Sequence, residues 1–214
     1  KCLSVHIGSQ ILSYKPYEKM LQVVDNIIKK NNFKFEYIDL GGGMGISYLD
    51  DKKKLNYLKY NQIIKKFLKK NKCKIILEPG RSIIGSVGIL ISKIIYIKEN
   101  KSKNFIILDA AMNDFMRPAL YGAKHKIIPV VRKNKKSKKT YEFVGPICET
   151  TDKFLNVKKF QALNEKDLVI ICDVGAYGSS LSSNYNVRAK SPEILIKGYN
   201  IKVIEKKQKL SDLV

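Results

Sequence analysis

The sequence has 214 residues, enough for one large domain or roughly one and a half domains of about 150 residues. This length excludes a complete eight-unit βα barrel of about 250 residues joined to a second domain. Apolar residues make up 44% and charged residues 28%, so the chain can bury a core, and wholesale disorder is excluded.

The formal net charge of +22 is typical of proteins that bind nucleic acid or an anionic surface. Only four of the 41 basic residues are Arg, however, and Lys is spread over nearly every segment. Such dispersion indicates a compositional bias, of the kind that an A/T-rich coding sequence produces. The run from Arg132 to Lys139 holds six basic residues in eight without interleaved aromatic residues. We therefore expect a loop between two strands there, and no nucleic-acid partner.

Four cysteines are present: Cys2, Cys73, Cys148 and Cys172. No C-x-x-C spacing occurs among them, so we expect neither a metal site nor a disulfide framework, and reduced thiols favour a cytoplasmic protein. The longest apolar stretch, 82–92, has about half of the roughly 20 residues that a membrane helix needs, so no membrane partner is expected. The chain opens on Lys1 directly into an apolar run, and we expect a fragment that lacks upstream residues.

The first half alternates short apolar strands with helical stretches. Apolar spacing predicts strands at 2–7, 35–40 and 74–77 and helices at 16–30 and 55–71. This order predicts parallel strands joined by crossover helices. A polar or glycine-rich cluster directly follows each strand. Ligands bind at this edge of parallel sheets, so the three clusters are expected to face one site.

Past Gly88, short β-prone runs predict a mostly antiparallel second domain. The runs cover 89–98, 105–109, 127–132, 141–144, 168–174 and 193–205. The sequence is thus divided into an α/β part, 1–88, and a β domain, 89–214.

Three consecutive glycines, Gly41 to Gly43, follow the second predicted strand. Without Cβ atoms, their backbone N–H groups can form an anion-binding nest. Glycine clusters more often mark tight turns, and the sequence lacks the complete P-loop and dinucleotide fingerprints. Both interpretations stay open from these residues alone.

Glu78 ends the third predicted strand, and Arg81 follows closely. A carboxylate at the end of an apolar strand would be partly desolvated and would need a positive partner. Arg81 could be that partner in a purely structural pair. Alternatively, a cationic heteroaromatic ring faces Glu78 and Arg81 binds an anion; the residues favour neither interpretation.

Three further side chains also have two interpretations. His6 is either a hydrogen-bonded structural residue or a catalyst. Cys148 lies between a strand and a polar turn, where a buried inert thiol is the ordinary interpretation. The Tyr177 hydroxyl follows a strand and could bond an anion or a backbone carbonyl.

Together, these motifs resemble those of the diaminopimelate decarboxylases, pyridoxal-phosphate enzymes of the alanine-racemase-like fold (group IV decarboxylases). The matching stretches run in family order: His6–Gln10, Gly41–Gly45, Glu78–Arg81, Asp109–Asp114, Arg117–Tyr121, Cys148–Glu149, Gly175–Gly178 and Ser183–Asn186. The resemblance implies that 1–88 is the C-terminal portion of a (β/α)8 barrel that binds pyridoxal phosphate. Residues 89–214 would form a mostly antiparallel β-barrel or sandwich.

For the cofactor, pyridoxal 5'-phosphate, the resemblance implies phosphate contacts from Gly42, Gly43, Ser9 and Tyr177. Glu78 would keep the pyridine nitrogen protonated, which makes the ring a better electron sink for the carbanion left by CO₂. His6 would stack on the face of the ring.

For the reaction, the resemblance implies decarboxylation of meso-2,6-diaminopimelate at its D-centre to L-lysine, the last step of lysine biosynthesis. The residues that would bind the far end of this substrate are Arg81, Arg117, Tyr121, Glu149 and Tyr177. The two arginines would clamp the far carboxylate, and Glu149 would take the far ammonium. Cys148 would donate or relay the proton that replaces CO₂.

The family's Schiff-base lysine lies upstream of the His6 segment, so none of the 37 lysines can be assigned to it, and the chain alone is expected to be inactive. The resemblance implies a homodimer in which the Cys148–Glu149 loop enters the neighbour's site. Two alternatives stay open: a sibling decarboxylase of ornithine, arginine or carboxynorspermidine, and a non-catalytic regulatory relative. Arg117 together with Glu149 favours a substrate with a second zwitterionic end.

Overall fold

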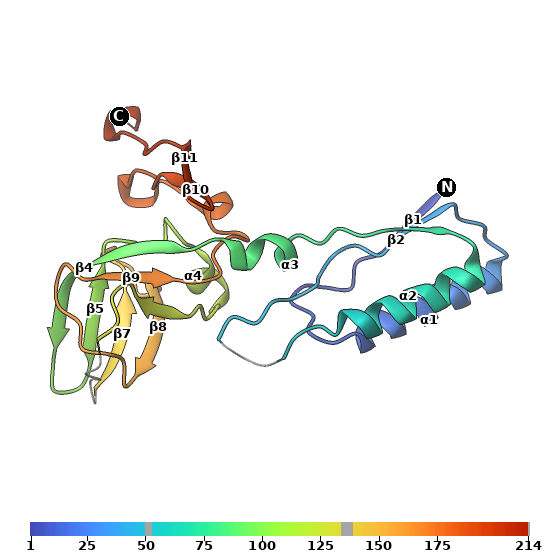
Figure 1. Ribbon diagram of the computed structural model, residues 1–214, viewed down its shortest axis with the longest axis horizontal. Coiled ribbons are helices and arrows are strands. Elements are labelled where there is room, and N and C mark those ends of the chain that lie inside the picture. Colours follow the sequence, from blue (N-terminus) through green and yellow to red (C-terminus); the bar gives the residue numbers. More distant parts are fainter. Residues whose placement is uncertain (50–52, 134–138, 214) are drawn as a thin grey trace. The chain divides into compact units, whose positions relative to one another are not determined.

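The computed structural model describes residues 1–49, 53–133 and 139–213. Contacts divide the chain into two compact units, Lys1–Val87 and Gly88–Val214, and Figure 1 labels most of their elements. Gly88 belongs to the second unit, where its carbonyl accepts the N–H of Val174 at 3.0 Å. Most of the basic run lies outside the described residues, so they do not test the loop expected there.

The first unit contains three parallel strands and two long helices. The strands β1 (Cys2–Ser4), β2 (Tyr37–Asp39) and β3 (Lys74–Ile76) are hydrogen-bonded in that order. Helix α1 (Lys15–Asn31) connects the first two strands and α2 (Tyr57–Asn71) the last two, and Figure 1 shows these helices side by side. The predicted alternation of strands and helices is confirmed. The strands are shorter than predicted, and the described residues of this unit form an open sheet.

Local signals set the ends of these helices. A proline in the first turn starts α1, and Asn32 ends it in the left-handed conformation. The Asn56 side chain accepts the N–H of Lys59 and so caps α2. The apolar faces of both helices pack on β2, with Tyr17, Leu21, Val24, Ile38, Leu40 and Phe67 in the core. A short helix, α3 (Arg81–Ile84), follows the third strand and was not predicted.

The second unit is built on one mixed sheet of six strands in the order β6-β9-β4-β5-β7-β8. Its strands are β4 (Leu90–Glu99), β5 (Asn104–Leu108), β6 (Ile127–Pro129), β7 (Thr140–Val144), β8 (Lys153–Lys158) and β9 (Leu168–Ile171). Four of the five pairings are antiparallel, but β5 and β7 run parallel. The sheet is therefore mostly antiparallel, as predicted. Its one parallel pair arises because the segment between β5 and β7, which contains α4 and β6, returns the chain in the same direction.

Two features of this unit differ from the elements predicted from the sequence. The single run predicted at 193–205 is a hairpin of β10 (Glu193–Lys197) and β11 (Asn200–Glu205), because Gly198 turns the chain at φ 60°. Strand β8 was not predicted, because its lysine-flanked segment shows little apolar alternation. The shorter helices of this unit are α4 (Arg117–Tyr121), η2 (Ser179–Leu181), η3 (Tyr185–Val187) and η4 (Leu210–Asp212), and η1 (Gly85–Val87) ends the first unit. None of the helices within the described ranges is long and apolar enough to cross a membrane.

Candidate functional site

In the first unit, the ends of the three parallel strands meet. A Cβ atom on Gly42 would lie 2.2 Å from the Glu78 carbonyl oxygen, and one on Gly43 would lie 2.2 Å from that of Gly8. The Glu78 N–H donates to the Gly41 carbonyl at 2.9 Å. Loop segments from three separate parts of the chain therefore converge on the glycine triplet with no room for side chains.

Most of the backbone N–H and C=O groups of Gly41–Gly43 form hydrogen bonds with other residues. The bonds join Gly41 O to Glu78 N, Gly42 O to Tyr17 Oη, Gly43 O to Ile11 N and Gly41 N to Asp39 Oδ1. Within the part of the chain that the structure describes, the N–H groups of Gly42 and Gly43 have no acceptor. Gly42 is buried, and a buried N–H without a partner is costly, so this pair of donors fits an anionic oxygen.

Positive φ angles at Gly41 (63°) and Gly43 (81°) give the triplet its shape. A side chain would be strained at either position. His6 stands beside the triplet, since its Nδ1 would lie 2.6 Å from a Cβ on Gly41, and its side chain is exposed. The arrangement is a cradle whose two N–H donors and neighbouring imidazole suit a phosphorylated ring.

Arg81 does not pair with Glu78. Its guanidinium donates to the Tyr48 hydroxyl at 2.5 Å and to Ser9 Oγ at 3.1 Å. In the described chain, no ion pair joins Arg81 to the Glu78 carboxylate, and Glu78 is exposed. The expected desolvation of Glu78 and the structural-pair interpretation are therefore both wrong for this unit. The carboxylate is left accessible to a ligand at the end of β3.

In the second unit, three residues named by the sequence analysis come together around one guanidinium. The Cζ atom of Arg117, at the start of α4, lies 5.8 Å from the ring centroids of both Tyr121 and Tyr177. Arg117 is only 6% exposed, whereas both tyrosines are exposed. Tyr177 adopts the left-handed conformation at φ 58°, which sets the direction of its side chain from the loop after β9.

The Cys148–Glu149 loop connects β7 and β8. Cys148 is exposed, so the ordinary interpretation of a buried thiol is wrong in the described chain. Backbone and side-chain donors of Thr151 and Thr150 hold the pKa of Glu149 below its usual value, which keeps it negatively charged. A carboxylate maintained in this way suits a cationic group on a ligand.

A buried carboxylate organises this loop. Asp152 is 2% exposed and accepts the N–H of Ile147 at 2.9 Å and that of Met112 at 2.7 Å. Burial raises the pKa of Asp152. The two bonds tie the chain just before Cys148 to the segment that leads into α4. No role was predicted for Asp152, whose spacing of four residues from Cys148 is the only signal in the sequence.

His125 is a second residue for which no role was predicted. It is 1% exposed, and its Nε2 atom lies 3.4 Å from Arg117 Nε. Histidine is rare in this sequence, which contains only two, and this rarity is a usable signal. No group of three or more His, Cys, Asp or Glu side chains in the described ranges could hold a metal ion.

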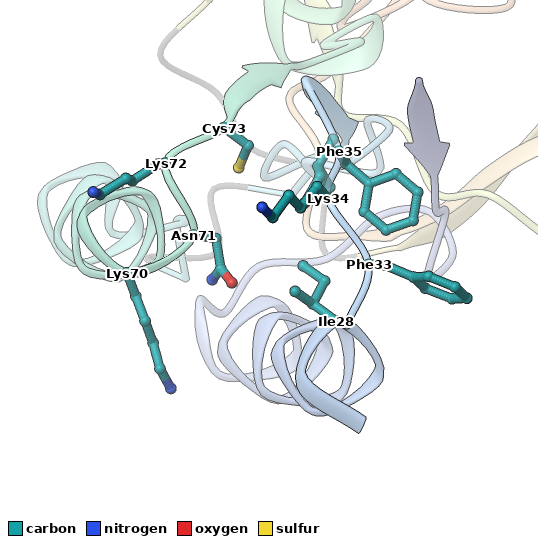
Figure 2. A pocket seen from close by; sticks show the side chains of 9 residues that line it. Ile28, Phe33, Lys34, Phe35, Lys70, Asn71, Lys72 and Cys73 are labelled. Carbon is teal, nitrogen blue, oxygen red and sulfur yellow. The ribbon is translucent and has the colours of Figure 1, made fainter. Parts of the chain in front are cut away.

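A hollow in the first unit lies at the opposite end of the strands. It has a volume of about 350 Å³ and is lined by residues that precede β2 and β3 and by the ends of α1 and α2, as Figure 2 shows. Lys70 on its rim forms an ion pair with Asp25, with 2.5 Å between Nζ and Oδ2. Burial raises the pKa of the Cys73 thiol. The hollow therefore offers neither the free N–H groups nor the carboxylate found at the strand ends.

Comparison with known proteins assigns the chain to a family. The family model described as "Pyridoxal-dependent decarboxylase, C-terminal sheet domain" matches residues 14–175. The chain belongs to this family of pyridoxal-dependent decarboxylases. Diaminopimelate decarboxylases from Aquifex aeolicus and Zymomonas mobilis are 40% and 41% identical to it over 213 and 218 residues, covering 98% and 99% of this chain.

Solved structures of this decarboxylase family are similar to the chain. Diaminopimelate decarboxylase from Helicobacter pylori, complexed with L-lysine, matches 99% of it with a TM-score of 0.88 and 38% identity. The enzyme from M. jannaschii, also with L-lysine, matches 98% with a TM-score of 0.92 and 33% identity. The chain spans about half the length of these relatives: 50% and 51% of the two sequences, and 53% and 50% of the two structures.

Proposed function

We propose that the protein containing this chain decarboxylates meso-2,6-diaminopimelate to L-lysine and CO₂ with pyridoxal 5'-phosphate as cofactor. The observation that carries the proposal is the pair of Gly42 and Gly43 N–H groups, which have no acceptor among the described residues and lie near the exposed carboxylate of Glu78. Its support in the comparisons is that relatives about 40% identical are named diaminopimelate decarboxylase and that two similar structures hold L-lysine.

In this proposal, the chain's own residues hold the cofactor. The phosphate accepts hydrogen bonds from the N–H groups of Gly42 and Gly43 and from the hydroxyls of Ser9 and Tyr177. Glu78 keeps a proton on the pyridine nitrogen, and His6 packs on the face of the ring. When bound, the cofactor supplies an electron sink for the electron pair left by CO₂.

The substrate's far end is recognised by charge. Arg81 and Arg117 bind the far carboxylate, Glu149 binds the far ammonium, and the hydroxyls of Tyr121 and Tyr177 add hydrogen bonds. The low pKa of Glu149 and the two tyrosine rings beside Arg117 support these roles. Cys148, exposed on its loop, donates or relays the proton that replaces CO₂.

The wider architecture is part of the proposal. Residues 1–87 form the C-terminal portion of a βα barrel, and the lysine that binds the cofactor covalently lies in a part of the protein outside this chain. The protein is a cytoplasmic homodimer in which the Cys148–Glu149 loop completes the partner's site. The three parallel strands with crossover helices and the four free cysteines support these statements.

The test is turnover by the full-length protein with pyridoxal phosphate. We expect L-lysine and CO₂ from meso-diaminopimelate and at least about 100-fold lower kcat/KM for ornithine, arginine and carboxynorspermidine, because each lacks the second zwitterionic end. Preference for one of these three compounds would identify a sibling decarboxylase. Tight binding of the cofactor without turnover of any of them would favour a regulatory relative.

A further inference from the structure

His125 is a buried titratable side chain to which the proposed function gives no task. It lies between α4 and β6, and its ring packs edge-on against Phe115 with 4.6 Å between ring centroids. Both ring nitrogens have polar neighbours. Nε2 lies 3.4 Å from Arg117 Nε, and Nδ1 lies 2.9 Å from the Cys172 carbonyl oxygen.

These neighbours determine which ring nitrogen carries the proton. A guanidinium group can only donate, so Arg117 Nε–H donates and His125 Nε2 accepts with its lone pair. A carbonyl oxygen can only accept, so Nδ1 carries the hydrogen that is donated to Cys172. His125 is therefore neutral in the Nδ1–H form. A protonated ring would present a donor to a donor and place two positive charges together.

The bond has a geometric consequence for Arg117. Rotation of the guanidinium about its last side-chain bond is restrained, because Nε–H is directed at an imidazole that is itself anchored to the chain after β9. With Nε–H so directed, an approaching carboxylate is bound through the two Nη groups. The same anchor is close in sequence to Tyr177, the second aromatic ring beside the guanidinium.

We propose that His125 is a positioning residue, which orients Arg117 toward the far carboxylate of the amino-acid substrate. This inference rests on the proposed function only for the assignment of Arg117 to that carboxylate. His125 itself contacts no reacting atom in the proposal. Its loss should therefore weaken recognition of one substrate group and leave the chemistry at the other end unchanged.

The test compares two substrates of the full-length protein. D-lysine has the same reacting D-amino-acid end as meso-diaminopimelate and a hydrogen in place of the far carboxylate. In His125→Phe, which keeps an aromatic ring but neither hydrogen bond, we expect kcat/KM for diaminopimelate to fall about tenfold, mainly through KM. The value for D-lysine should stay within about twofold. His125→Gln, whose amide can both accept and donate, should recover part of the loss.

Phe115→Leu is the matched control, because it removes the ring contact of His125 and leaves both hydrogen bonds in place. It should lower Tm without changing the ratio of the two kcat/KM values. Nitrogen-15 NMR of the wild-type protein should show a ring with a protonated Nδ1 and a bare Nε2, and this signal should be missing in both His125 variants.

An equal loss for both substrates in His125→Phe, no loss for either, or the opposite tautomer would overturn the role of His125 while the proposed function stands. If His125→Phe fails to fold, His125→Gln carries the comparison with the same criterion. A wild-type protein that turns over both compounds equally well would overturn the assignment of Arg117, and with it the role of His125.

Discussion

A Cβ atom on Gly42 would lie only 2.2 Å from the backbone oxygen of Glu78. The loops after β2 and β3 are therefore in backbone contact, and this contact fixes the distance between the free N–H groups of the triplet and the Glu78 carboxylate. In the proposed function, that distance has to match the span from the phosphate to the pyridine nitrogen of one cofactor molecule.

Gly42→Ala should separate these two loops. We expect the affinity of the full-length protein for pyridoxal phosphate to fall by about five- to 150-fold, because the added methyl displaces the Glu78 backbone at a cost of about 1–3 kcal/mol. Gly80→Ala is the control, since its Cβ would have no atom within 4 Å and Gly80 has a negative φ. Equal affinities for the two variants, measured by cofactor absorbance titration, would contradict the close packing described.

The neighbouring phenols Tyr17 and Tyr60 should respond in opposite ways to loss of the hydroxyl. Tyr17 donates to the Gly42 carbonyl at 3.0 Å, whereas the buried Tyr60 hydroxyl has no partner in the described chain. Tyr17→Phe leaves a buried carbonyl unsatisfied and should lower the free energy of unfolding by about 1–2 kcal/mol. Tyr60→Phe should leave it unchanged or raise it. Denaturant titration of both variants measures the difference, and a larger loss for Tyr60→Phe would refute this account.

Asp152→Asn should disturb the Cys148 loop. The amide directs an NH₂ group at one of the two backbone N–H donors, so we expect a loss of about 1–3 kcal/mol in stability together with a lower kcat. Gly145→Ala provides an independent variant, because its Cβ would lie 2.2 Å from Asp152 Oδ2 and push the same carboxylate. Full activity in both variants would show that the loop holds its conformation without Asp152.

The ion pairs of Asp25 should stabilise α1 in a pH-dependent way. The hydrogen bond from Lys70 lowers the pKa of Asp25 below its ordinary 3.8, with a further contribution from Lys29. A lowered folded pKa gives a stabilisation that is complete above the ordinary pKa and is lost as pH falls through the folded value. The difference in α1 amide exchange between wild type and Asp25→Asn should therefore be constant near neutrality and shrink below pH 3.8. A difference that grows on acidification would show the opposite sign of coupling.

Shared sites can be tested by mixing two impaired full-length variants at a cofactor concentration too low to saturate Gly42→Ala. Cys148→Ala and Gly42→Ala damage different units of the chain, so a mixed dimer would contain one site with neither change if the Cys148 loop completes the partner's site. We expect up to about a quarter of wild-type activity after subunit exchange, the statistical share of intact sites. Activity no higher than the sum of the separate variants would indicate that each chain builds its own site.

Local patterns predicted much of the fold. Apolar periodicity located α1 and α2 to within two residues at each end, and the strand–helix order predicted the parallel sheet. Two results depend on contacts distant in sequence: the parallel pairing of β5 with β7, and the Tyr48 partner of Arg81, 33 residues away. Such contacts leave no periodic signal, so they could not be read from the chain alone.

The candidate site residues were likewise predicted only where a local motif marks them. Motif order named the glycine triplet, Glu78 and Arg117 as candidate site residues. No role was predicted for His125 and Asp152, because their contacts are hydrogen bonds to segments 5 to 47 residues away. A buried polar side chain next to a binding residue is visible only after folding has placed both.

The most direct test of the central claim is a crystal structure of the full-length protein with pyridoxal 5'-phosphate. We predict phosphate oxygens within hydrogen-bond distance of the Gly42 and Gly43 N–H groups and the pyridine nitrogen beside the Glu78 carboxylate. A phosphate bound elsewhere, with both glycine N–H groups still without an acceptor, would contradict the account.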